Sequence, residues 1–390
     1  MRVMVSCGEP SGDLYAGALA RALLAREPGL DIFGFGGPLC QEGGVRLVGD
    51  YTGLSVTGLT EALRVLPATY AMLRRLVRAA DETRPDALVV VDYPDFNFRL
   101  MSRIAARGVP VVYYVTPQLW AWRPGRMKAM QRHVALALPI FPFEASLYQE
   151  AGVPVRFLGH PLVDRVPAPD PDAAEAARHR GALRAALGLA PSGPLVALLP
   201  GSRHNELSRL VPVIAAALPA IRAAVPDVVF AVACAPGRDP GEFAAILAAA
   251  PGTPVVQHRT DDVLAAADVV VTASGTATAQ TALHARPMVV VYKLSPLTYV
   301  LGKPLVTVDT YAMANLIAGE RIVPELIQDG CTPEAIATET VRYLREPDLR
   351  ARTEARLAGT RAKLGPPGST GRVADAVLAV VRGTPLPPGV

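Results

Sequence analysis

Two segments in the second half of the chain place small and cationic residues where an apolar run gives way to a helix-forming stretch. The first, LLPGSRHNEL at residues 198–207, has Gly201, Ser202 as the predicted N-cap, and Arg203 in the first turn. Backbone N–H groups at such a turn, together with an arginine side chain, form a site for a diphosphate. A capped helix with an exposed Arg203–Glu206 pair explains the same spacing equally well.

A second turn of this kind occurs in ASGTATAQTAL, residues 273–283. Ser274, Gly275 and Thr276 follow the apolar run VVVTA and open a helix. One such turn is weak evidence, but two turns at strand ends of one domain favour a nucleotide site. Neither turn has the GK[ST] ending of a P-loop.

Polar residues also follow an apolar run at the start of the chain. The segment SCGEPSGD, residues 6–13, brings Glu9, Ser11, Gly12 and Asp13 to a glycine-bearing turn. Its acidic character suits recognition of hydroxyl groups better than recognition of phosphate. A glycine-rich turn with Asp13 in the first turn of a helix accounts for the segment without any ligand.

The segment VVVDYPDFNF, residues 89–98, ends an apolar run on Asp92. A carboxylate at a strand end is where a general base can take a proton from an acceptor hydroxyl, and we assign that role to Asp92. Asp95 and Asn97 fit capping of the following helix better, although Asn97 is also a candidate contact for an acceptor sugar.

Aromatic and cationic residues are concentrated in YYVTPQLWAWRPGRMKAM, residues 113–130, which contains Trp120, Trp122, Arg123 and Arg126. Aromatic side chains beside cations can hold an amphiphile or a phosphate. Core tryptophans beside a solvated helix face explain the segment as well.

The elements that must position these residues are apolar runs that alternate with amphipathic stretches, the pattern of parallel strands covered by helices on both faces. The chain has 390 residues, more than the ~250–300 at which a single core stops growing, so two domains are expected. Residues 166–178, rich in Pro and Ala, break the pattern and predict a linker. Strands are predicted near residues 2–7, 31–35, 86–92, 110–115, 135–140 and 155–158, then 195–200, 227–233, 254–257, 268–272 and 288–292.

The predicted fold class is α/β, with two doubly wound, Rossmann-like domains facing an interdomain cleft. We expect an acceptor-binding domain over 1–170, a nucleotide-binding domain over 171–365, and a C-terminal helix and tail over 366–390 that pack back toward the first domain. The final PLPPGV should fray. Ligands of such folds bind at the carboxyl ends of strands, which is where the turns described above lie.

The composition of the chain argues against several classes of partner and cofactor. A formal charge of +4 with scattered Lys and Arg argues against nucleic acid. The four cysteines are far apart in sequence and the six histidines form no HxxxH or HExxH pair, so we expect neither a metal nor a disulfide, and a reduced cytosolic setting. Of the histidines, only His160, which follows a predicted strand, lies where we expect a cleft. No apolar run of 18 residues predicts a membrane span.

Residues 62–80, ALRVLPATYAMLRRLVRAA, form a basic amphipathic stretch. A helix of this kind can lie on anionic lipid. An ordinary helix with one face on the core is the interpretation that the pattern alone favours.

Taken together and in this order, the motifs resemble those of the lipid A disaccharide synthases, inverting glycosyltransferases of the GT-B fold. The similarity extends from about residue 6 to residue 328. The matching segments are GEPSGD, FGGP, LSVTGLTEAL, DYPDFN, YYVTPQLWAWRPGR, FPFE, FLGHP, LLPGSR, ASGTAT, MVVVYK and NLIAG.

The resemblance implies transfer of 2,3-diacylglucosamine from its UDP donor to 2,3-diacylglucosamine 1-phosphate (lipid X), which yields a β-1,6-linked disaccharide and UDP. It implies Asp92 as the base, and no cofactor or metal. The predicted nucleotide and diphosphate contacts are Gly201, Ser202, Arg203, Ser274, Gly275, Thr276, Gln280 and Asn315. The predicted acceptor or sugar contacts are Glu9, Ser11, Gly12, Asp13, Asn97, Trp122, Arg123 and His160.

Amphiphilic substrates imply peripheral contact with the inner face of the cytoplasmic membrane, for which we nominate residues 62–80. A homodimer is compatible with this membrane contact.

Three positions depart from the family pattern: Gln280 replaces the usual glutamate, Ala314 replaces a proline, and Gln118-Leu119 replaces Ser-Val. In GT-B enzymes the carboxylate accepts hydrogen bonds from the ribose. Gln280 would reduce a bond of roughly 1.5–3 kcal/mol to about half, which predicts weaker UDP binding that Gln280→Glu restores.

Two alternatives remain from the sequence. A UDP-N-acetylglucosamine 2-epimerase or another GT-B transferase shares paired nucleotide turns but does not explain the Asp92 motif or WAWRPGR. A membrane-associated nucleotide-sugar-binding protein without catalysis would fit Gln280 and Ala314, and the presence of Asp92 and Arg203 argues against it.

Overall fold

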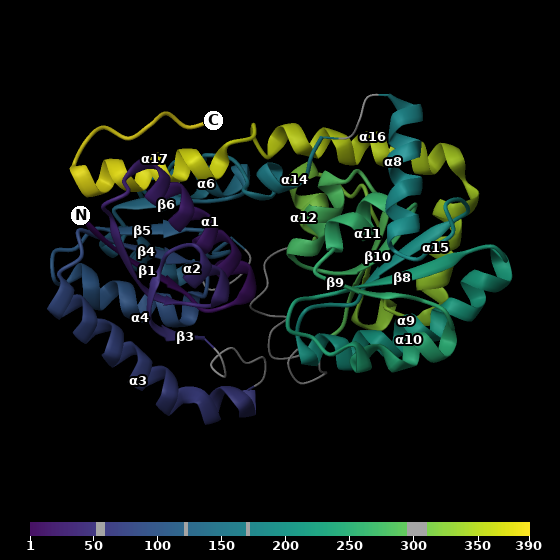
Figure 1. Ribbon diagram of the computed structural model, residues 1–390, viewed down its shortest axis with the longest axis horizontal. Helices are drawn as coiled ribbons and strands as arrows, with labels where there is room; N and C mark the ends of the chain where they lie inside the picture. Colours follow the sequence, from purple (N-terminus) through teal and green to yellow (C-terminus); the bar gives the residue numbers. More distant parts are fainter. Residues whose placement is uncertain (52–58, 121–123, 169–171, 295–309) are drawn as a thin grey trace. The chain divides into compact units, whose positions relative to one another are not determined.

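The computed structural model describes residues 1–51, 59–120, 124–168, 172–294 and 310–390, which form two compact units (Figure 1). Among these residues, one unit consists of Met1–Asp164 together with Leu364–Val390, and the other lies between Arg165 and Lys363. The chain thus leaves the first unit at Asp164 and returns to it at Leu364. The sequence had predicted these boundaries at 170/171, from the linker pattern, and at 365/366, where the C-terminal helix and tail begin.

The first unit is built on a six-stranded parallel sheet with the order β3-β2-β1-β4-β5-β6. The order reverses between β1 and β4, so the turns that follow these two strands flank a topological switch point, where α/β folds bind ligands. The strands are β1 (Arg2–Cys7), β2 (Asp31–Gly36), β3 (Arg46–Asp50), β4 (Ala87–Val91), β5 (Val111–Tyr114) and β6 (Leu136–Leu138).

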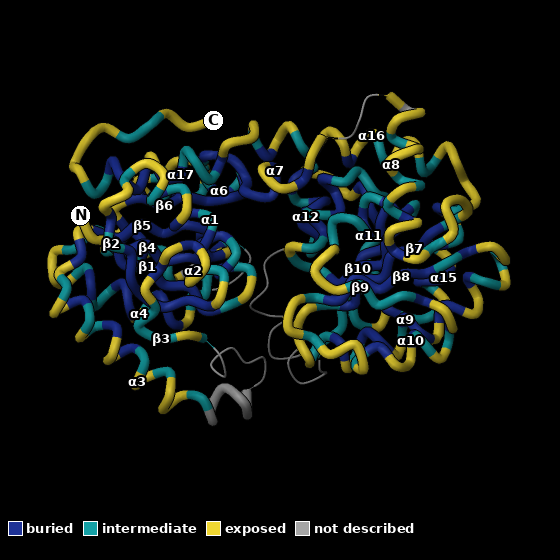
Figure 2. Tube along the Cα trace, in the orientation of Figure 1, coloured by how far each residue is buried: buried dark blue, intermediate teal, exposed yellow. Residues whose placement is uncertain are grey.

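Helices cover both faces of this sheet, which is why its central strands β1, β4 and β5 are apolar on both sides and buried (Figure 2). On one face α3 and α4 pack over Met4, Leu88 and Val90. On the other, α1 packs against α2 and α17, and α17 also contacts β4. The helices are α1 (Pro10–Arg26), α2 (Pro38–Glu42), α3 (Leu59–Thr83), α4 (Pro94–Ala105), α5 (Met127–His133), α6 (Pro142–Glu150) and α17 (Ser369–Arg382); α7 (Leu162–Arg165) spans the unit boundary.

The second unit repeats this design with the order β12-β11-β10-β7-β8-β9. Here the order reverses between β7 and β10, which places the two predicted phosphate turns on either side of the switch point. The strands are β7 (Leu195–Leu199), β8 (Val229–Cys234), β9 (Val255–Gln257), β10 (Val269–Ala273), β11 (Met288–Tyr292) and β12 (Glu325–Ile327). The helices are α8 (Ala173–Ala186), α9 (His204–Ala224), α10 (Ala244–Ala249), α11 (Thr260–Ala266), α12 (Thr276–Leu283), α14 (Met313–Ala318), α15 (Pro333–Arg345) and α16 (Pro347–Lys363).

The helix α9 is the one helix in the described part of the chain that is long and apolar enough to cross a membrane by length and composition. Its Leu210, Ile214 and Leu218 are buried in the core of the second unit, where α9 packs against α15 and α10. Core packing therefore explains its apolar sequence.

The structure departs from the predicted strands at three places. The run 155–158 makes only an isolated bridge from Val155 to Ala137. The carbonyls of Phe157 and Leu158 instead accept hydrogen bonds from the amide of Val390, 3.0 Å, and from Arg372 Nε, 3.1 Å. The predicted fraying of PLPPGV is therefore wrong at its last residue. Edge strands β3 and β12 were missed because they are short and only half buried.

Candidate active site

The backbone is strained where β4 ends. Asp92 and Tyr93 both adopt the left-handed conformation, with φ of 48° each. Val115, just after the neighbouring strand β5, has φ of 54°. Non-glycine residues in this region cost of order 1–3 kcal/mol each and persist only where the surrounding structure holds them. Such strain is typical of functional sites, and here it surrounds the predicted base.

The side chain of Asn97 holds this turn in place. Its Nδ2 atom lies 2.7 Å from the carbonyl oxygen of Asp92 and also reaches the carbonyls of Ser6, 3.3 Å, and Val91, 3.4 Å. Its Oδ1 atom accepts a hydrogen bond of 2.7 Å from the Ser6 hydroxyl. Asn97 is fully buried and is neither the predicted helix cap nor an exposed sugar contact. The structure gives it a positioning role.

The turn after β1 lies against the turn after β4. A Cβ atom on Gly8 would lie 2.1 Å from the ring of Tyr93, so only glycine allows this contact. Burial raises the pKa of Tyr93, and the nearby Glu9 charge contributes. A Cβ on Gly12 meets the Val91 carbonyl oxygen at 3.5 Å. The structure therefore brings the predicted acceptor residues Glu9 and Gly12 next to the Asp92 turn, and Ser11 lies between them in sequence.

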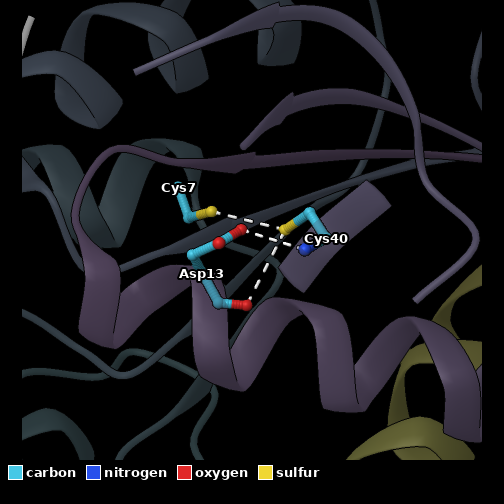
Figure 3. A group of neighbouring side chains, drawn as sticks. All are labelled: Cys7, Asp13 and Cys40. Atoms are coloured by element: carbon cyan, nitrogen blue, oxygen red, sulfur yellow. Dashed lines mark hydrogen bonds between the residues drawn. The ribbon is translucent and has the colours of Figure 1, made fainter. Parts of the chain in front are cut away.

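Asp13, another predicted acceptor contact, is buried. The Cys7 and Cys40 Sγ atoms lie 3.6 Å apart beside it (Figure 3). Its carboxylate accepts hydrogen bonds from the backbone amides of Gly37, 2.8 Å, Leu39, 3.0 Å, and Cys40, 3.0 Å, and from the Tyr51 hydroxyl, 3.4 Å. Because four donors occupy it, the carboxylate anchors the start of α2, and a sugar contact by Asp13 has no support here.

The group in Figure 3 carries metal-ligand atom types, and these atoms lie within 4.8 Å of one another. The hydrogen bond with Cys40 and burial raise the pKa of the Cys7 thiol well above its usual range, so the thiol stays protonated. The arrangement is a hydrogen-bonded core cluster. Sequence spacing missed it because Cys7 ends β1 and Cys40 lies in α2, which follows the neighbouring strand β2, so the fold brings together residues that are 33 positions apart.

Glu144, in the FPFE motif, anchors the segment that leads to the tryptophan motif. It is fully buried in the first turn of α6, and burial raises its pKa to about 8. It accepts hydrogen bonds from Trp120 Nε1, 3.0 Å, and from the Thr116 hydroxyl, 3.4 Å. Trp120 is therefore held inside the unit by its hydrogen bond to Glu144. The predicted contacts Trp122 and Arg123 lie outside the described residues, as does part of the LSVTGLTEAL motif.

His160 lies in the core, where its ring packs against Tyr15 and Phe141. Its Nδ1 atom accepts a hydrogen bond of 3.0 Å from the Leu162 amide, and Nε2 has no hydrogen-bond partner among the described residues. Burial lowers its pKa to about 3, so the imidazole is neutral. A fully buried ring does not support the predicted sugar contact.

In the second unit, the turn after β7 shows the capped helix and the Arg203–Glu206 pair that its spacing predicted. The helix α9 begins at His204 with Arg203 as its N-cap, one residue later than the predicted cap Ser202. The Glu206 carboxylate accepts hydrogen bonds from the amides of Ser202, 3.1 Å, and Arg203, 3.4 Å, and lies 3.5 Å from the Arg203 guanidinium. It thus covers the amides that a diphosphate would use. Gly201, with φ of 129°, leaves room for this carboxylate.

The turn after β10 is built differently. The helix α12 starts at Thr276, and its N-cap Gly275, with φ of 143°, provides no side-chain cap. The Ser274 hydroxyl donates a hydrogen bond of 2.8 Å to the carbonyl oxygen of Tyr311 and so fastens that segment to the turn. Of the two helix N-termini, that of α12 is the one without a carboxylate cap.

Asn315 supports the same turn from behind. It is buried, and its amide donates to the Val323 carbonyl, 3.0 Å, and to Glu325, 2.8 Å. Its oxygen accepts hydrogen bonds from the amides of Ile322, 2.8 Å, and Val323, 3.0 Å. Glu325 in turn accepts from the Tyr311 amide, 2.9 Å. Every polar atom of the Asn315 side chain is used inside the protein, so it supports the turn after β10 and the structure gives no support to the predicted nucleotide contact.

Gln280 has a charged neighbour that the sequence did not reveal. Its Nε2 atom donates a hydrogen bond of 2.7 Å to Asp261, whose carboxylate also lies 3.0 Å from His284 Nε2 and 3.9 Å from Arg165. Burial acts to raise the pKa of Asp261, but the hydrogen bonds from His284 and Gln280 outweigh it and lower the pKa. The negative charge that is missing at position 280 is therefore present next to it.

Solved structures with the same architecture define the class. The UDP-N-acetylglucosamine 2-epimerase from Neisseria meningitidis has a TM-score of 0.67 and 11% identity, covering 97% of this chain and 100% of that one. MurG from Acinetobacter baumannii has a TM-score of 0.56 and 17% identity, covering 97% and 99%. At such identities the likeness shows the fold alone. The chain is an α/β protein of the two-domain GT-B fold, as the sequence predicted.

Sequence comparison then identifies the family. The family model described as lipid-A-disaccharide synthetase matches residues 3–371. The lipid-A-disaccharide synthase of Geobacter sulfurreducens is 43% identical over 385 residues, covering 97% of each chain, and that of Myxococcus xanthus is 42% identical over 389 residues, covering 100% and 98%. The chain belongs to the lipid-A-disaccharide synthase family of glycosyltransferases, which act in lipid A biosynthesis. The family predicted from the motifs is confirmed, and the epimerase alternative is rejected.

We expect Asn97→Ala to lower kcat for glycosyl transfer on the order of 100-fold, because the Asp92 turn loses its anchor and shifts. The UDP dissociation constant should not change, since the nucleotide turns are in the other unit. Steady-state kinetics and calorimetry measure both. Ser6→Ala is the matched control, because it removes a bond to Asn97 but leaves the bond to Asp92. An equal loss of kcat in both variants would contradict the positioning role.

The raised pKa of Glu144 leads us to expect that the Tm of the protein depends on pH. Its folded-state pKa of about 8 is raised from 4.5, so the protonated form stabilises the fold fully below the lower value, and this contribution is lost as pH rises through the upper value. Between about pH 5 and pH 9 the Tm of the wild type should fall more than that of Glu144→Gln, which keeps an acceptor for Trp120. A pH-independent Tm difference between the two proteins would argue against a buried protonated carboxyl.

Proposed function

We propose that this chain transfers 2,3-diacylglucosamine from UDP to 2,3-diacylglucosamine 1-phosphate with inversion at the anomeric carbon. The acceptor hydroxyl oxygen attacks that carbon, the bond to the β-phosphate oxygen breaks, and the hydroxyl proton passes to Asp92. The products are the β-1,6-linked disaccharide 1-phosphate and UDP. Family membership supports the reaction class, and the strained Asp92 turn at the switch point carries the assignment of the base.

The second unit provides the groups that stabilise the leaving UDP. Negative charge develops on the diphosphate as the glycosidic bond breaks, and positive poles aimed at that charge lower the barrier. The uncapped N-terminus of α12 and the Arg203 guanidinium supply such poles, with the N-terminus of α9 available once Glu206 moves away. We propose that these groups serve without a metal or other cofactor.

Peripheral membrane contact at the cytoplasmic face forms part of the proposal, because both substrates are amphiphiles. The helix α3 supports it. Outside the chain ends, Leu66 and Tyr70 are the exposed large hydrophobic side chains among the residues whose burial is described, with exposed fractions of 44% and 47%. They lie one helical turn apart on α3, next to the exposed Arg74 and Arg75.

The decisive experiment measures UDP release from UDP-2,3-diacylglucosamine and 2,3-diacylglucosamine 1-phosphate dispersed in detergent. We expect Asp92→Asn to lower turnover by about 10²–10⁴-fold with UDP binding unchanged, because only the proton acceptor is lost. Asp95→Asn is the matched control, since Asp95 lies three residues away and forms an ion pair with Arg126. Full turnover by Asp92→Asn would refute the role of the base. Wild-type protein that binds UDP without turnover would favour a non-catalytic binding protein.

The structure revises the expectation for Gln280. Gln280→Glu would place a second carboxylate beside Asp261, so we expect this single variant to lose thermal stability and to gain no affinity for UDP. The double variant Gln280→Glu/Asp261→Asn removes the repulsion and should bind UDP up to about tenfold more tightly than the single variant. Calorimetry with UDP measures this, with Asp261→Asn as the control. If the single variant binds UDP as tightly as the double one, Asp261 does not influence the nucleotide site.

A further inference from the structure

A hollow of about 260 Å³ lies at the outer side of the first unit, between α3 and α4. The apolar side chains of Leu73 and Val77 line it together with Tyr70. Three arginines, Arg74, Arg78 and Arg103, and one carboxylate, Asp81, complete the lining. None of these residues takes part in the site described above.

Three arginines share this hollow, and among the described residues none of the three forms an ion pair. The guanidinium carbon of Arg74 lies 5.4 Å from the centroid of the Tyr70 ring, and that of Arg103 lies 6.0 Å from the same centroid. In the part of the chain that the structure describes, no carboxylate is within salt-bridge distance of Arg74, Arg78 or Arg103. Two cations at one ring and a third in the same hollow repel each other, and an anion between them would relieve the repulsion.

Asp81 does not neutralise this charge, because it is already paired. Its carboxylate oxygens bind Arg107 Nε at 2.5 Å and Nη2 at 3.0 Å. The hydrogen bond from Arg107 lowers the pKa of Asp81, which keeps this pair ionised. The hollow therefore presents a net positive charge of three arginines.

The surroundings of the hollow are apolar on the side of α3 that carries Leu66 and Tyr70, both exposed. A ligand that fits must combine an anionic group for the guanidinium groups with apolar parts for these two side chains. Guanidinium groups match the oxygens of a phosphate in geometry and charge. A phospholipid is the partner with this combination, since its phosphate lies directly above its acyl chains.

We propose that the hollow between α3 and α4 binds the phosphate of an anionic phospholipid headgroup, held by Arg74, Arg78 and Arg103. This inference rests on the proposed membrane contact of α3 and specifies it: the helix meets the membrane through one defined headgroup site in addition to its apolar residues. The tyrosine ring keeps Arg74 and Arg103 in place for the phosphate.

The test is sedimentation of the full chain with vesicles of phosphatidylcholine, with and without phosphatidylglycerol. The triple variant Arg74→Gln/Arg78→Gln/Arg103→Gln should bind phosphatidylglycerol vesicles about 100-fold more weakly than the wild type, since each arginine near the surface contributes about fivefold. Its binding to pure phosphatidylcholine and its UDP release in detergent should stay unchanged. The control triple variant Arg75→Gln/Arg99→Gln/Arg132→Gln loses the same charge from exposed positions outside the hollow and should bind clearly better.

Equal losses in the two triple variants would overturn the headgroup site in favour of diffuse attraction. The phosphate bound in the hollow could also be free inorganic phosphate, which calorimetry tests. If inorganic phosphate binding depends on the three arginines while the triple variant binds vesicles as well as the wild type, the hollow is a free-phosphate site and the proposal is overturned. Failure of the wild type to bind any vesicle would instead refute the membrane contact itself. UDP release in detergent reports separately on the glycosyltransferase reaction.

Discussion

The reversal of strand order at the centre of each sheet is the constraint on which the rest of this structure depends. Where β1 meets β4, and where β7 meets β10, the following helices leave toward opposite faces, so the two turns at that edge are not covered by a crossover. In the first unit this edge carries Asp92, and in the second it carries the two turns predicted to bind the nucleotide. The parallel register of neighbouring strands brings the two turns of each unit side by side.

Fully satisfied buried polar groups then fix those turns. Every polar side-chain atom of Asn97 and Asp13 in the first unit, and of Asn315 in the second, forms a hydrogen bond within the protein. Such networks confer one well-defined geometry, because each missing partner would leave a buried polar group at a cost of about 1–3 kcal/mol. The left-handed backbone at Asp92 persists because Asn97 and the Tyr113 hydroxyl both bind its carbonyl oxygen.

Periodicity and turn composition were enough to predict the fold class and the residues at the strand ends, because these depend on local sequence. The family was predicted from the resemblance of the ordered motifs. The roles of Asp13, Asn97, Asn315 and His160 were not predictable in this way: a motif places them near the site, but only long-range packing shows that they are buried. The Cys7–Cys40 contact and the Gln280–Asp261 pair likewise join residues from different elements. The edge strands were missed because half-buried edges lack the apolar run that identifies central strands.

In the proposed reaction, the carboxylate of Glu206 competes with the diphosphate for the turn after β7. Because it is tethered one helical turn away, its effective concentration at the amides of Ser202 and Arg203 is high, and a weakly bound monovalent anion gains little by displacing it. A diphosphate can bind this turn and the start of α12 together, so it overcomes a threshold that simple anions do not. Under this proposal, the same carboxylate would return to the amides as the nucleotide leaves, which would make release of the product easier. If the proposed nucleotide site is right, the protein's own side chain thus sets a selectivity for a diphosphate over simple anions.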